Sequence, residues 1–113
     1  MKKSRIKRQS SKKAIEEKRW RALEHDLHLM NTNRSEYTGK FPTEPDDWVT
    51  CYQVEYHHIR GRRGKRVYDP FNVIALTPTE HKRIEDEIDK VSEEELESIV
   101  RPIRINQAFE EDE

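Results

Sequence analysis

The residues best suited to chemistry lie between Tyr56 and Glu85, a stretch that holds three of the five histidines. His57 and His58 are adjacent, and Glu85 follows His81 by four positions. Adjacent residues of a strand point to opposite faces, whereas residues four apart on a helix share a face. We therefore expect one histidine of the pair to meet His81 and Glu85, and its neighbour to have a different role.

A cluster of His57, His81 and Glu85 would offer two imidazoles and one carboxylate to a divalent metal ion. Such a donor set leaves coordination positions open for water and phosphate, which suits metal-assisted hydrolysis. His58 beside this cluster would be a general base with a pKa in the useful range. For Glu85, a solvated helix carboxylate is the alternative interpretation.

Residues 60–66 have the sequence RGRRGKR, which predicts an exposed loop between two strands. Arginine is well suited to bidentate contact with phosphate, so this loop next to the histidine pair is expected to bind a nucleic-acid backbone. A solubilising hairpin tip is the alternative. The predicted contacts are Arg60, Arg62, Arg63, Lys65 and Arg66.

The elements that must position these side chains follow from periodicity and capping signals. Apolar residues at helical spacing predict a helix from about Ser11 to Met30, with Trp20, Leu23, Leu27 and Met30 on one stripe. Strands are predicted from Trp48 to His58 and over residues 72–76. Thr77, Pro78 and Glu80 form a capping box that starts a helix bearing Ile84, Ile88 and Val91. Ser92 and Glu95 start another, which Pro102 is expected to end.

The composition predicts one domain with a small core. The chain has 113 residues, of which 32% are hydrophobic and 40% are charged. Residues 1–23 carry ten Lys or Arg, and residues 85–113 carry twelve Asp or Glu, so a polyanionic partner is expected at the basic front. Cys51 is the single cysteine, which excludes an intrachain disulfide. No apolar run is long enough for a membrane span or a secretory signal, so we expect an intracellular, cytoplasmic protein.

These observations predict an α+β protein in four segments. Residues 1–13 are expected to be a disordered basic arm, and residues 14–34 a basic amphipathic helix. Residues 35–91 would form the strand-loop-strand-helix unit that holds the histidines. Residues 92–113 would form a short acidic helix and tail.

The segment that contains HHIRGR and DPFNVIALTPTEH resembles the HNH endonuclease superfamily, whose ββα-metal finger (the His-Me finger) carries a histidine pair, an asparagine and a helical histidine in order. His57 and His58, Asn72 and His81 match that order. The interval from His58 to Asn72 is 14 residues, and that from Asn72 to His81 is nine. The resemblance covers roughly residues 35–91.

The resemblance implies a role for each matching residue. His57 and His81 would be metal ligands, His58 the base that deprotonates water, and Asn72 a brace for the loop that orients His58. Glu85 stands where some members have a third ligand, a histidine, and a carboxylate there favours Mg²⁺ or Mn²⁺ over Zn²⁺. The implied reaction is hydrolysis of DNA, which leaves 5′-phosphate and 3′-hydroxyl ends.

Many HNH proteins frame the finger with a zinc knuckle of four cysteines, and here each cysteine is replaced. Ser35, Thr38, Thr77 and Glu80 stand at the corresponding positions. Because a hydroxyl does not substitute for a zinc thiolate, no structural zinc is expected. The first helix, the helix caps and Trp48 are expected to stabilise the fold instead.

Two other functions are compatible with the same residues. A finger of this kind could hold DNA or a partner nuclease without cutting, or its histidines could hold a metal ion that stabilises a small core. This chain resembles the small free-standing HNH proteins of phages or mobile elements, and a phage-encoded protein would act in the cytoplasm of a bacterial host cell. We expect no membrane partner and no small-molecule cofactor, and a double-strand break would need either a dimer or two successive nicks.

Overall fold

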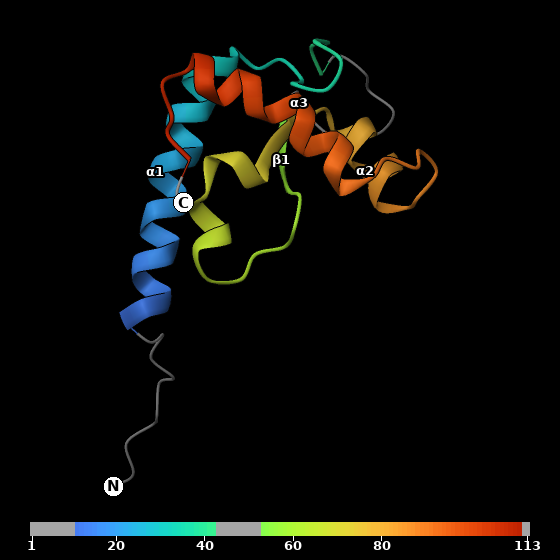
Figure 1. The fold of residues 1–113 in the computed structure, drawn as a ribbon. Helices are drawn as coiled ribbons and strands as arrows, with labels where there is room; N and C mark the ends of the chain where they lie inside the picture. The colour runs from blue at the N-terminus through green and yellow to red at the C-terminus, as the bar shows by residue number, and fades with distance from the viewer. Residues whose placement is uncertain (1–10, 43–52, 112–113) are drawn as a thin grey trace, which may run out of the picture.

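The computed structural model describes residues 11–42 and 53–111, which form helices around a small antiparallel sheet (Figure 1). The fold is therefore α+β, as predicted. No helix in these two ranges is long and apolar enough to span a membrane. In chain order the elements are α1 (Ser11–Asn31), β1 (Glu55–His58), the 3₁₀ helices η1 (Gly64–Tyr68) and η2 (Pro70–Asn72), β2 (Val73–Leu76), α2 (Pro78–Glu85) and α3 (Glu93–Asn106).

The two strands pair with His57 opposite Ile74 and His58 opposite Val73. Alternation along each strand gives the sheet two different faces. Val73 packs with the buried residues of α1, whereas Ile74 and Leu76 pack with Leu96 and other residues of α3. The sheet is thus a middle layer, and the neighbouring residues His57 and His58 face opposite sides of it.

Helix α1 begins at Ser11, so the last three residues of the predicted disordered arm are helical. Residues 1–10 lie outside the described ranges. Three of the four predicted stripe residues are buried, but Met30 is exposed and Asn31 takes the inward position in its place. The reason is geometric, because Asn31 follows Leu27 by four residues and its side chain donates a hydrogen bond to the Tyr56 hydroxyl (3.0 Å).

The first strand is shorter than predicted within the described part of the chain. Gln53 and Val54 precede β1 without strand geometry, although Val54 is buried and its N–H bonds to Asn33 Oδ1 (3.0 Å). That side-chain acceptor satisfies the amide which a longer strand would have paired. The remainder of the predicted strand and Trp48 lie outside the described residues.

The helix starts are confirmed, and one predicted helix end is wrong. Thr77 and Glu80 form the expected capping box, with Pro78 in the first turn of α2. Ser92 caps α3 by accepting from the Glu95 N–H (3.1 Å). Pro102 lies inside α3, which continues to Asn106. Proline removes one backbone hydrogen bond, but Pro102 is exposed to water, and the buried Arg104 anchors the turn that follows it.

Ile88 was predicted to continue the apolar stripe of α2. The helix instead ends at Glu85, and Ile88 is exposed. Ile84 and Val91 do pack against the core cluster that contains Leu96. The left-handed conformation of Glu87 (φ 58°) turns the chain at this point and separates Ile88 from the helical repeat.

A fully buried arginine joins α3 to the rest of the fold. Arg104 has a side-chain exposure of 0%, and its partner Glu36 has 5%. Its guanidinium donates to both carboxylate oxygens of Glu36 and to Gln107 Oε1. It also donates to the carbonyls of Pro70 and Val73 (both 2.8 Å). Every donor of the side chain is therefore satisfied, which a buried charge requires.

Arg104→Met is expected to destabilise the protein by about 3–5 kcal/mol, because it leaves the Glu36 carboxylate buried without its counter-charge. Chemical denaturation measures this loss. The matched control is Arg101→Ala, which removes an exposed ion pair with Glu111 (62% and 38% exposed) and should cost about 1 kcal/mol or less. Equal losses in the two variants would contradict the structural role of Arg104.

Candidate metal and nuclease site

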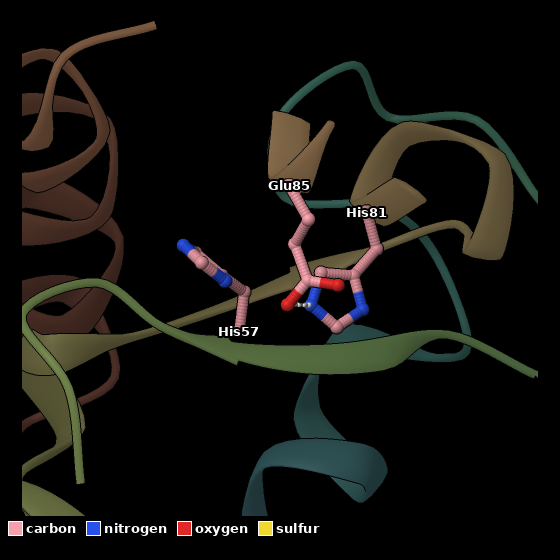
Figure 2. Close-up of side chains that lie close together, drawn as sticks. All are labelled: His57, His81 and Glu85. Atoms are coloured by element: carbon pink, nitrogen blue, oxygen red, sulfur yellow. Dashed lines mark ion pairs between the residues drawn. The ribbon is translucent and has the colours of Figure 1, made fainter. Parts of the chain in front are cut away.

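His57, His81 and Glu85 form one cluster at the contact between β1 and α2. Their ligand atoms all lie within 4.8 Å of one another. Figure 2 shows His57 rising from β1, while His81 and Glu85 point toward it from α2. The two imidazole rings are 5.3 Å apart between centroids, and His81 Nε2 lies 3.2 Å from Glu85 Oε2. The structure thus brings together the three residues that were predicted as ligands.

Glu55 orients the imidazole of His81. Its Oε1 accepts a hydrogen bond from His81 Nδ1 (2.8 Å), so Nδ1 carries a proton. A carboxylate behind a histidine of this kind fixes the ring and leaves Nε2 for a metal ion. Sequence reasoning did not assign Glu55, although strand alternation places it on the same face as His57.

The donor set fits a divalent metal ion. Nε2 of His81 lies 3.2 Å from Oε2 of Glu85, which is an ion pair when His81 is protonated, and a bound metal ion would take the place of that proton between the two ligands. Burial lowers the pKa of His57, and the charge of His81 lowers it further. The neutral imidazole that a metal requires is therefore favoured at His57. Glu85 is exposed, which leaves the cluster open to water and substrate.

His58 lies on the opposite face of the sheet, against α1. Its Nε2 is 3.0 Å from the Val67 carbonyl, which can only accept, so Nε2 carries the proton and Nδ1 is the acceptor. The Trp20 ring packs on its edge at 4.6 Å between centroids. Burial lowers the pKa of His58, the Val67 hydrogen bond raises it, and Arg62 lowers it, with a net lowering. A neutral imidazole with an unprotonated Nδ1 is the form that a general base needs.

Asn72 holds the loop that contains the basic residues. Its side-chain amide donates to the carbonyls of Gly61 and Arg66 (both 3.0 Å) and accepts from the Arg60 N–H (2.8 Å). Three bonds from one buried side chain join both ends of the loop. Since this loop leads to Val67, which bonds His58, Asn72 supports the position of His58 indirectly.

The predicted phosphate contacts fall into two groups. Arg60 is paired with three glutamates of α3: its guanidinium is 2.7 Å from Glu97, 3.0 Å from Glu93 and 3.6 Å from Glu94. The hydrogen bonds to Glu97 raise the pKa of Arg60 and lower that of Glu97. Arg60 therefore ties the loop to α3 in the free protein, and its contact with DNA stays a prediction.

The remaining basic side chains of the loop are exposed. In the described ranges, no ion pair with a carboxylate is found for Arg62, Arg63, Lys65 or Arg66. Arg66 donates to the Arg60 carbonyl (3.3 Å), and Arg62 reaches toward His58. Of these four side chains only Arg62 is found near His58 in the described ranges, and contact of the group with a phosphate backbone stays a prediction.

Ser35, Thr38, Thr77 and Glu80 lie close together in the structure. The Glu80 carboxylate accepts hydrogen bonds from the hydroxyls of Ser35 and Thr38 and from the Thr77 N–H. Ser35 in turn accepts from the N–H groups of Tyr37 and Thr38 (3.1 and 3.2 Å). A carboxylate at the centre of this hydroxyl cluster joins the 35–40 turn to the start of α2. These groups satisfy one another's hydrogen bonds, and the absence of a structural zinc stays a prediction.

Glu55→Gln is expected to weaken Mn²⁺ binding about tenfold or more, because the amide is a weaker acceptor for His81 Nδ1. Isothermal titration calorimetry with Mn²⁺ measures the affinity of the full chain. Glu110→Gln, an exposed change near the C-terminus, is the matched control and should bind as the wild type does. An unchanged affinity of Glu55→Gln for Mn²⁺ would contradict the proposal that Glu55 orients His81.

In the metal-free protein, His58 is expected to titrate below the ordinary histidine pKa of 6.5. Between pH 6.5 and the lower pKa of the folded protein, His58 is protonated in the unfolded chain but not in the folded one. The free energy of unfolding should therefore fall as the pH drops below 6.5 and level off below the folded-state pKa. Imidazole NMR spectra and denaturation at a series of pH values test this. A His58 midpoint at or above 6.5 would contradict it.

Comparisons with protein-family models, with curated proteins and with solved structures found no match to this chain.

Proposed function

We propose that this protein is a metal-dependent DNA endonuclease that uses an HNH-type ββα-metal finger. The proposal rests mainly on one observation: possible metal ligands lie on one face of the sheet, and a histidine suited to act as a base lies on the other. His57, His81 and Glu85 form a metal-ligand set on one face. His58, the next residue along β1, presents an unprotonated nitrogen on the other face. Hydrolysis of a phosphodiester needs both a cation for the phosphate and a base for water.

The residues of the chain divide the reaction between them. His58 takes a proton from the attacking water at Nδ1, and its Nε2–H stays bonded to Val67. Arg62, Arg63, Lys65 and Arg66 hold the phosphate backbone by charge. His57, His81 and Glu85 hold the metal ion, which when bound neutralises the phosphate and stabilises the leaving 3′ oxygen. The expected products have 5′-phosphate and 3′-hydroxyl ends.

Several features of the fold support Mg²⁺ or Mn²⁺ as a catalytic ion over a structural one. The Arg104–Glu36 pair and the Glu80 cluster join the elements through hydrogen bonds within the chain. The proposed metal ligands include the exposed Glu85, and none of the three belongs to either apolar core cluster. A structural metal protein unfolds on chelation, whereas this one is expected to remain folded and stop cutting.

His58→Ala is expected to abolish cleavage and leave the fold intact, because it removes the base without touching the ligand cluster. Plasmid DNA is incubated with wild type and variant, with Mn²⁺ and with a chelator, and circular dichroism checks folding. Lys90→Ala, an exposed change on the turn before α3, is the control and should cut at the wild-type rate.

The outcomes separate the candidate functions. Metal-dependent cutting by the wild type and none by His58→Ala would support the nuclease. DNA binding without cleavage of duplex, nicked or single-stranded substrates would favour a non-catalytic binding module. Loss of folding on chelation would favour a structural metal site.

A further inference from the structure

The basic loop contains one arginine whose surroundings differ from those of its neighbours. Arg62 Nη1 lies 3.5 Å from His58 Nδ1. Its guanidinium carbon also lies 5.7 Å from the centroid of the Trp20 ring. Trp20 is buried and itself contacts His58. Trp20 of α1, His58 of β1 and Arg62 of the loop therefore contact one another, with Arg62 on the Nδ1 side of the imidazole.

The contact between Arg62 and His58 is weak. A separation of 3.5 Å is at the outer limit of hydrogen bonding, and neutral imidazole is a poor partner compared with an anion. A phosphate oxygen would accept a shorter, charge-assisted bond from the same guanidinium. Because Arg62 is exposed and has no carboxylate partner among the described residues, it is free to exchange one acceptor for the other.

We propose that Arg62 is the side chain that binds the scissile phosphate, and that in the free protein it covers Nδ1 of His58. This inference rests on the proposed nuclease function and deepens it. Phosphate binding draws the guanidinium away from Nδ1, which then accepts a hydrogen bond from water. Trp20 supports the guanidinium by a cation–π contact, so helix α1 is a positioning element of the site.

The other basic residues of the loop do not have this arrangement. Arg60 is held by the glutamates of α3, and Arg66 is turned back to a loop carbonyl. Arg63 and Lys65 are exposed, and no contact with His58 is found for either in the described ranges. The phosphate next to the base is therefore assigned to Arg62, while its neighbours supply general attraction to the backbone.

The indole of Trp20 provides a readout that does not depend on cleavage. The full chain contains two tryptophans, so ¹⁵N-labelled protein gives two indole N–H signals, and Trp48→Phe assigns that of Trp20. The protein is titrated in chelator with inorganic phosphate and, separately, with a short DNA duplex. The Trp20 signal should shift saturably with both ligands in the wild type.

Arg62→Gln should lose this shift, and Arg62→Lys should keep only part of it, because lysine lacks the planar guanidinium. Lys90→Ala removes an exposed charge elsewhere and should respond as the wild type does. With Mn²⁺ and DNA, Arg62→Gln should lower kcat/KM by about 10- to 100-fold, the usual effect of one charge-assisted hydrogen bond.

An identical Trp20 response in wild type and Arg62→Gln, or no response in the wild type, would overturn the assignment. A response that depends on Arg62 in a protein that cuts no DNA would support the phosphate site and remove the nuclease. Cleavage that depends on His58 but not on Arg62 would support the nuclease and contradict the assignment of the scissile phosphate to Arg62.

Discussion

The buried pair of Arg104 and Glu36 determines how the small sheet is held. Glu36 also bonds both backbone groups of Ala75: its N–H donates to the Ala75 carbonyl (2.8 Å), and its Oε1 accepts from the Ala75 N–H (2.9 Å). The outer edge of β2 is thereby covered, which a two-stranded sheet needs for stability. Because β2 leads directly into α2, the same pair fixes the helix that carries His81 and Glu85.

Strand alternation then explains how adjacent residues acquire separate roles. On one face, His57 and Glu55 meet α2, and on the other, His58 and Tyr56 meet α1. His58 is largely buried against Trp20 and the Val67 carbonyl, whereas Glu85 of the ligand cluster is exposed. One four-residue strand therefore places the proposed base and the proposed metal ligand His57 next to each other in sequence but in different surroundings.

Structural features that depend on residues close in sequence could be predicted, whereas those that depend on pairing of residues far apart in sequence could not. The capping box of Thr77 and Glu80 and the convergence of His81 with Glu85 follow from spacing alone. The partnership of Arg104 with Glu36 spans most of the chain, and only the position of Arg104 after Leu96 and Val100 on the apolar stripe hints at it. For the same reason, Pro102 was expected to end a helix that this distant ion pair holds together.

The cluster around Glu80 has a consequence for the chemical environments in which the fold persists. Its joining groups are hydroxyls, a carboxylate and backbone N–H groups, and none of these is a thiolate. Oxidants, thiol-reactive mercury compounds and competition for scarce zinc act on knuckles built from cysteine. Here the hydrogen bonds that join the 35–40 turn to α2 involve no thiol, so oxidants and thiol reagents have no target among them.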